Sequence, residues 1–186
     1  TKKGKIKIEN KEQADAILAE LRNASFRVDG VKRGVRQITP APPFITSTMQ
    51  QEASRKLGFA ARRTMKAAQE LYEGVEVEGI GAVGLITYMR TDSLRISEDA
   101  RKEGSDYIRE TYGADYLPPK PRYFKSRSNA QDAHEAIRPS TPSLTPARVK
   151  DSLTSDQYRL YKLIWERFIA SLMANCVHDT CQGDIA

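Results

Sequence analysis

Two clusters of prolines divide this sequence and limit where regular structure can form. TPAPPF at residues 39–44 contains three prolines, and a second cluster, LPPKP, lies at residues 117–121. Proline has no backbone N–H to donate, and its ring clashes with the preceding helical turn, so neither cluster can lie inside a helix. The first cluster therefore predicts a connector between two subdomains, and the second predicts a further break in the chain.

The segment before the first connector has the pattern of strand, helix and strand. Residues 5–9 alternate lysine with isoleucine, as in a half-buried strand. Asn10, followed by Gln13, predicts a helix N-terminus. The apolar residues that follow have helical spacing: Ala14, Ile17, Leu18 and Leu21. Residues 26–38 then predict a second strand, which gives a β-α-β start.

Two short helices are predicted after the connector. The first begins at a capping box formed by Ser47 and Gln50 and ends at Gly58, and the second covers residues 62–73 and ends at Gly74. A pair of helices around a glycine-containing turn fits a helix-turn-helix unit, but it equally fits an ordinary αα-hairpin. The sequence leaves both alternatives open.

The rest of the chain also predicts mainly helices. The glycine-rich segment EGIGAVG predicts a flexible loop, because it lacks the pattern of a phosphate-binding loop. Helices are predicted over residues 97–112, 130–138 and 154–172, and the tail after residue 175 predicts a strand. The longest helix carries an aromatic stripe that is typical of packing rather than of base stacking. The expected fold class is α+β, mainly α.

Composition and net charge indicate more about the binding partner of the chain than about its activity. The chain has 186 residues, a net charge of +6 and a pI near 9.3, which favours an anionic partner. The positive excess is concentrated in residues 1–40 and 121–150. No apolar run has the length of a membrane span, and the first residues, TKKGKIKIEN, lack the apolar region of a signal peptide. Cys176 and Cys181 cannot form a disulfide framework or a four-ligand zinc site, so we expect buried thiols and no metal site.

The segment ITYMRTDS is the most specific local feature. If residues 88–92 are extended, Tyr88, Arg90 and Asp92 lie on one face of the strand. A phenol is mostly protonated at neutral pH, so a phenol nucleophile needs nearby cations and a route for its proton. An arginine can bind two phosphate oxygens and stabilise the transition state. These residues suit phosphoryl transfer, but they also fit a strand with one surface ion pair.

The segment DAHEAIRPS supplies a second group of polar residues. On the predicted helix, His134 and Arg138 are four residues apart and share a face, whereas Glu135 points elsewhere. An imidazole beside a guanidinium suits phosphate binding. The alternative is a helix C-terminus at which Arg138 contacts the last carbonyl groups and His134 is a surface residue.

These two segments, together with PPFITSTMQQEASRKLGF and in this order, resemble the type IA DNA topoisomerases, most closely the bacterial topoisomerase I group. The resemblance implies that Tyr88 attacks a DNA phosphodiester to give a 5′-phosphotyrosine. It implies that Arg90 contacts the scissile phosphate and that His134 forms a hydrogen bond to it. Asp92 and Arg138 match the family motifs and are expected to have supporting, DNA-binding roles.

The resemblance also implies a domain organisation. A helical, helix-turn-helix-containing domain over residues 41–174, similar to the DNA-binding domain of CAP, would be inserted into a β-rich arch domain. Residues 1–40 and 175–186 would be the two arms of that arch. With no initiating Met and a terminal strand lacking a partner, the chain is expected to be a piece of a larger enzyme.

Further expectations concern cofactor, partners and location. The family binds Mg²⁺ through an acidic D-x-D cluster in another domain, and no Asp-x-Asp occurs in this sequence. We therefore expect Mg²⁺ outside this chain and no relaxation activity from the chain alone. The expected enzyme is an ATP-independent isomerase that relaxes negative supercoils. It would act on single-stranded DNA, as a monomer, in the bacterial cytoplasm at the nucleoid, with no membrane partner.

Two other functions remain as alternatives. A tyrosine recombinase or type IB enzyme also uses Tyr, Arg and His, but there the tyrosine follows the histidine, whereas Tyr88 precedes His134. A non-catalytic helix-turn-helix module would bind DNA through its basic segments, and Tyr88 would then serve only in packing.

Overall fold

The structure is a computed structural model that describes residues 7–124 and 134–186, and these divide into two units. One unit comprises Thr1–Arg36 and Val177–Ala186, and the other comprises Gln37–Cys176. The sequence placed the domain boundaries at residues 40/41 and 174/175, and the assignment of the outer segments to an arch domain stays a prediction.

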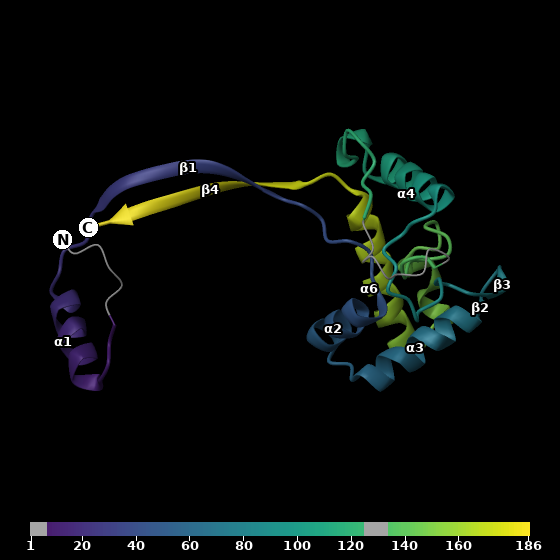
Figure 1. Cartoon of the computed structure of the whole chain (residues 1–186), viewed down its shortest axis with the longest axis horizontal. Helices are drawn as coiled ribbons and strands as arrows, with labels where there is room; N and C mark the ends of the chain where they lie inside the picture. The colour runs from purple at the N-terminus through teal and green to yellow at the C-terminus, as the bar shows by residue number, and fades with distance from the viewer. Residues whose placement is uncertain (1–6, 125–133) are drawn as a thin grey trace. The chain divides into compact units, whose positions relative to one another are not determined.

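In its described residues, the first unit contains helix α1 and parts of two paired strands (Figure 1). Helix α1, Lys11–Arg22, begins as predicted, because the Asn10 side chain accepts a hydrogen bond from the Gln13 backbone N–H at 2.9 Å. Strands β1, Val28–Ile38, and β4, Cys176–Ile185, form a two-stranded sheet. Arg27 and Ala186 exchange both backbone hydrogen bonds at 2.9 Å, as in an antiparallel pair.

Two sequence-based expectations for these elements were wrong, those for the strand at residues 5–9 and for the two cysteines, and the apolar residues of α1 are exposed. Residues 7–9 form no strand, and residues 1–6 lie outside the described part of the chain. The apolar stripe of α1 is not buried, since Leu18 is 50% exposed and Leu21 is 45% exposed. Cys176 and Cys181 are exposed on β4, where every residue is exposed, rather than buried. Periodicity and residue type predict which face a segment could bury, but burial itself requires a partner.

The second unit is predominantly helical, which confirms the coarse fold class. Its helices are α2, Thr46–Leu57; α3, Ala61–Glu73; α4, Glu98–Thr111; the short α5, Pro146–Val149; and α6, Ser155–Leu172, with 3₁₀ turns η1, Ala114–Tyr116, and η2, Lys150–Ser152. Helix α6 packs against α2, α3, α4 and α5. The largest fully buried side chains are Phe44, Met49, Phe59, Leu71, Leu85, Met89, Ile108, Ile137, Leu160, Tyr161, Ile164 and Phe168.

Helix α6 is at the centre of this core because its sequence supplies both a cap and a wide apolar stripe. The predicted capping box is confirmed: Thr154 N–H donates to the Gln157 side chain at 2.9 Å, and Gln157 N–H donates to Thr154 Oγ1 at 3.4 Å. The buried Tyr161 hydroxyl donates to the Leu144 carbonyl at 2.5 Å, and burial raises the pKa of this tyrosine. The Trp165 indole N–H donates to the Pro142 carbonyl, so the aromatic stripe serves packing, as predicted.

Helices α2 and α3 form the pair predicted from the sequence, with one correction. Gly58 ends α2 with a φ of +69°, the left-handed conformation that glycine favours. The predicted capping box of Ser47 and Gln50 was wrong: Thr48 Oγ1 accepts from the Ile45 N–H at 3.0 Å and donates to its carbonyl at 3.1 Å. Whether the pair acts as a helix-turn-helix unit stays a prediction.

The predicted flexible loop after α3 is instead a β-hairpin. Strand β2, Val75–Val77, pairs antiparallel with β3, Gly81–Val83, and Val75 faces Val83 in the register. Gly79 in the connecting turn has a φ of +75°, which its lack of a side chain permits. Valines at alternate positions therefore outweighed the glycine content that had indicated a flexible loop.

Candidate active site

The segment that contains Tyr88 keeps the predicted alternation without forming a regular strand. Its only strand-like pairing in the described residues is an isolated bridge between Ile86 and Pro139. Tyr88, Arg90 and Asp92 are exposed, as predicted for residues on one face. The intervening residues are buried: Met89 is 1% exposed, Thr91 is 6% exposed and Ser93 is 2% exposed.

The start of α2 holds this segment in place. The Thr46 hydroxyl donates to the Met89 carbonyl at 2.8 Å and accepts from the Thr91 N–H at 2.9 Å. The Thr46 N–H donates in turn to the Thr91 carbonyl at 2.9 Å. One side chain thus satisfies backbone groups on both sides of Arg90, so hydrogen bonds to the start of α2 hold a segment that is not a regular strand.

The segment that contains His134 was predicted as a helix, and this prediction was wrong. Residues 130–133 lie outside the described part of the chain, and residues 134–140 contain no helix. Ile137 N–H donates to the Phe44 carbonyl at 2.8 Å, and Thr87 N–H donates to the Arg138 carbonyl at 3.0 Å. Ser140 N–H donates to the Leu85 carbonyl at 2.9 Å. Bonds to two distant segments replaced the helix that the composition favoured.

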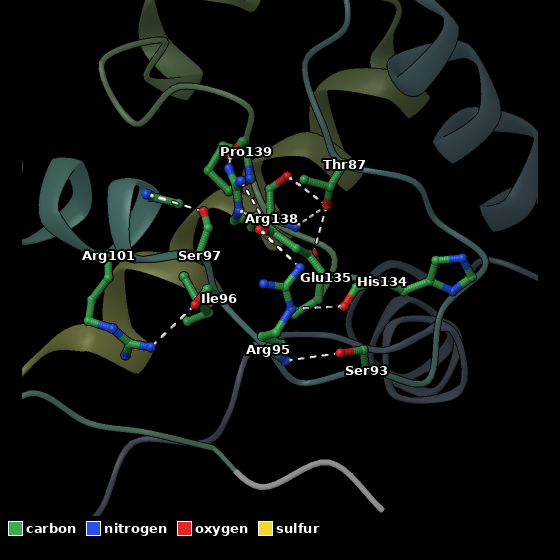
Figure 2. A network of polar contacts seen from close by, with 12 residues as sticks. Thr87, Ser93, Arg95, Ile96, Ser97, Arg101, His134, Glu135, Arg138 and Pro139 are labelled. Atoms are coloured by element: carbon green, nitrogen blue, oxygen red, sulfur yellow. Dashed lines mark hydrogen bonds and ion pairs between the residues drawn. The ribbon is translucent and has the colours of Figure 1, made fainter. Parts of the chain in front are cut away.

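As a result, Arg138 does not share a helical face with His134. Its side chain is 12% exposed, and its Nε and Nη2 lie 2.8 Å and 2.7 Å from Glu135 Oε2. Glu135, predicted to point elsewhere, also lies 3.8 Å from Arg95 Nη2. Figure 2 shows Arg95 and Arg138 on either side of Glu135, with Thr87 beside the Arg138 backbone. Arg138 thus forms an ion pair with Glu135 of the same chain, and its expected supporting role would act through that pair.

Two cavities meet at His134. The larger, of about 670 Å³, is lined by Arg90, Asp92 and His134 together with the first turn of α2. The smaller, of about 350 Å³, is lined by Tyr88, His134, Glu135 and Arg138, with Tyr72 from the end of α3. The structure therefore places all five predicted site residues at these two cavities, with Tyr88 and Arg90 lining different ones.

The side chain of Tyr88 is half-exposed and has two aromatic neighbours. Its ring is 41% exposed and lies 6.3 Å from the His134 ring, at an interplanar angle of 62°. The Tyr72 ring lies 5.3 Å away at 65°. Tyr72 was not predicted as a site residue, because its spacing in the helix predicted over residues 62–73 indicated only a packing position. A phenol beside an imidazole, near an exposed guanidinium, is an arrangement that can bind a phosphate and attack it.

The described residues contain neither a candidate metal cluster nor a candidate membrane span. Within residues 7–124 and 134–186, no three or more His, Cys, Asp or Glu side chains are grouped so that they could hold a metal ion. Over the same residues, no helix combines the length and apolar character needed to cross a membrane.

Comparison with known proteins identifies the family. A sequence model of the DNA topoisomerase family matches residues 1–185. The full-length topoisomerase I of Thermotoga maritima, solved in a monoclinic crystal form, is similar with a TM-score of 0.77 and 41% identity. The similarity covers 90% of this chain but 26% of the Thermotoga protein, so the chain spans about a quarter of that protein's length. The chain therefore belongs to the DNA topoisomerase family, as a relative of one part of bacterial topoisomerase I.

Proposed function

We propose that Tyr88 is the nucleophile of a type IA DNA topoisomerase. Its phenolic oxygen forms a bond to the phosphorus of one DNA strand, and the bond from phosphorus to the 3′ oxygen breaks. The tyrosine loses its proton, the departing oxygen gains one, and the products are a 5′-phosphotyrosine and a 3′-hydroxyl. The observation that carries this proposal is the half-exposed Tyr88 ring beside His134, within a chain of the DNA topoisomerase family.

The neighbouring side chains have distinct proposed roles. Arg90 and His134 line one cavity and bind the non-bridging oxygens of the scissile phosphate, so that charge developing in the transition state is stabilised. Asp92 lines the same cavity and has a supporting role. Arg138 supports the site through Glu135, with which it forms a bidentate ion pair, and borders the cavity that contains Tyr88.

The reaction as a whole involves more than these residues. Reversal of the transesterification after strand passage relaxes negative supercoils, and it needs no ATP because the phosphotyrosine conserves the energy of the broken bond. Mg²⁺ would be bound by other domains of the enzyme, where it would help hold the DNA phosphates. We also propose that the enzyme acts as a monomer in the bacterial cytoplasm, at the nucleoid.

The test is Tyr88→Phe in the full-length enzyme that contains this chain. Because phenylalanine lacks the attacking oxygen, relaxation of a negatively supercoiled plasmid should fall by about 10³-fold or more, and the covalent DNA adduct should disappear from a denaturing gel. Tyr116→Phe removes a hydroxyl from another exposed tyrosine and should leave both readouts unchanged. Relaxation by Tyr88→Phe at the wild-type rate would rule out the nucleophile. DNA binding by the wild-type enzyme with no covalent adduct would favour a helix-turn-helix module.

A second experiment tests the dependence on other domains. The 186-residue chain is incubated with single-stranded DNA and Mg²⁺ and analysed on a denaturing gel. We expect no adduct, because the described residues hold no cluster that could bind the metal ion that the proposed reaction uses. Robust adduct formation would contradict this expectation and would show that the chain alone can cleave DNA.

A further inference from the structure

Tyr72 lies one residue before the end of α3, and its ring contacts the ring of Tyr88. The centroids are 5.3 Å apart and the planes meet at 65°, the edge-to-face geometry that aromatic pairs prefer. Both tyrosines line the cavity of about 350 Å³, and they are exposed to nearly the same extent, 40% and 41%. Tyr72 is therefore neither a core residue nor an isolated surface residue.

Backbone contacts bring the end of α3 against the segment that precedes Tyr88. The Leu85 N–H donates to the Leu71 carbonyl at 2.8 Å, and the Ser140 hydroxyl donates to the Gly84 carbonyl at 2.7 Å. A Cβ on Gly84 would lie 2.7 Å from the Tyr72 carbonyl oxygen, closer than real Cβ atoms come. Glycine is required for this approach, so the backbone itself sets where Tyr72 lies relative to Tyr88.

The contact matters because Tyr88 must combine exposure with a defined direction. A half-exposed tyrosine can occupy several rotamers, whereas attack on phosphorus requires the oxygen to lie in line with the departing group. His134 provides a second ring neighbour at 6.3 Å, but it also borders the larger cavity together with Arg90. Tyr72 borders only the cavity that contains Tyr88, among the described cavities.

We propose that Tyr72 is a positioning residue, whose ring holds the Tyr88 side chain in the rotamer that attacks DNA. The proposal rests on the proposed function of Tyr88 as the nucleophile. It assigns the effect to the ring of Tyr72 and not to its hydroxyl, because the contact is made between rings. A different role, direct stacking of Tyr72 on a DNA base, would show itself in binding affinity rather than in the rate of cleavage.

The experiment measures single-turnover cleavage of a single-stranded oligonucleotide by the full-length enzyme with Mg²⁺, and separately the Kd for that oligonucleotide. Tyr72→Phe keeps the ring, whereas Tyr72→Leu and Tyr72→Gln remove it with different side-chain polarity. Tyr116→Leu is the matched control, since the Tyr116 ring is exposed and lies 5.9 Å from another tyrosine, Tyr112. Thermal unfolding of each variant checks that the protein remains folded.

We expect Tyr72→Phe and Tyr116→Leu to cleave within about twofold of the wild-type rate. Tyr72→Leu and Tyr72→Gln should cleave about tenfold more slowly with an unchanged Kd, because misplacing a reacting atom lowers the rate and leaves binding intact. An unchanged rate in both ring-lacking variants would overturn the proposal. So would a loss that appears only in Kd, or an equal loss in Tyr72→Phe.

The two proposals fail in different ways. If Tyr88→Phe still forms the covalent adduct, the proposed function fails, whatever Tyr72 does. If Tyr88→Phe forms no adduct and the ring-lacking Tyr72 variants cleave at the wild-type rate, only the positioning role of Tyr72 fails.

Discussion

The two segments that supply the site, residues 85–93 and residues 134–140, differ in how far their local pattern decides their structure. The first keeps a two-residue alternation of exposed and buried side chains over residues 88–93, as its sequence predicts. The second has a helical composition but forms no helix, because its backbone bonds to other segments of the chain. The comparison teaches that a half-buried pattern can persist without a regular strand, whereas helix propensity yields to backbone pairing within a core.

If the second segment is a structural part of the core, truncation of Ile137 should have the largest effect. This side chain is fully buried, and its N–H donates to Phe44. Ile137→Ala should lower the free energy of unfolding by about 3 kcal/mol, through lost burial and the cavity that remains. Urea unfolding monitored by Trp165, the only tryptophan, reports on this unit. Ile80→Ala, at a 43% exposed position, is the control, and an equal loss there would break the comparison.

The ion pair of the second segment should give the next largest effect. Glu135→Ala leaves Arg138 without its bidentate partner at a side chain that is 12% exposed, so we expect a loss of about 2 kcal/mol in urea unfolding. Glu166→Ala removes one partner of a pair in which both side chains are at least half-exposed, and should cost less than about 0.5 kcal/mol. Similar losses in both variants would mean that Glu135 does not fix this segment.

Thr87 connects the two segments, and its removal should have the smallest effect. Its hydroxyl donates to the Ala136 carbonyl at 2.7 Å and accepts from the Arg138 N–H at 3.0 Å. Thr87→Val keeps the side-chain shape and should lower the free energy of unfolding by about 1 kcal/mol. Thr87→Ser retains the hydroxyl and should recover part of that loss. If Thr87→Val leaves the free energy of unfolding unchanged, the two segments pair through their backbones alone.

Much of the fold was predictable because helix ends are encoded within a few residues. Asn10, Gly58 and the pair of Thr154 and Gln157 all have the capping roles predicted for them. The capping box of α2 was assigned to the wrong residues, because Ser47, Thr48 and Gln50 all have side chains that can cap a helix. Which of them does so depends on the direction from which the folded chain enters the helix. The β2–β3 hairpin was missed because the three glycines of EGIGAVG obscured the alternating valines.

The candidate site was only partly predictable. Tyr88, Arg90 and Asp92 lie on one side, as expected from a period of two, and His134 contacts the Tyr88 ring. The partners of Arg138 could not be predicted, because an assumed helix directed its side chain toward His134 rather than Glu135. Tyr72 had no signal of its own, since nothing in a helical stripe distinguishes a tyrosine that packs from one that borders a cavity.

The sequence by itself determined the caps and ends of most helices, the mainly helical class, the alternation around Tyr88 and, through its motifs, a resemblance to type IA topoisomerases. Tertiary structure alone decided that residues 134–140 form no helix, that Arg138 binds Glu135 and that Tyr72 contacts Tyr88. The physical reason is the separation along the sequence over which each kind of interaction acts. Caps and periodicities act within one or two helical turns, whereas Thr87 and Ala136 are 49 positions apart, and their contact depends on how the whole core packs.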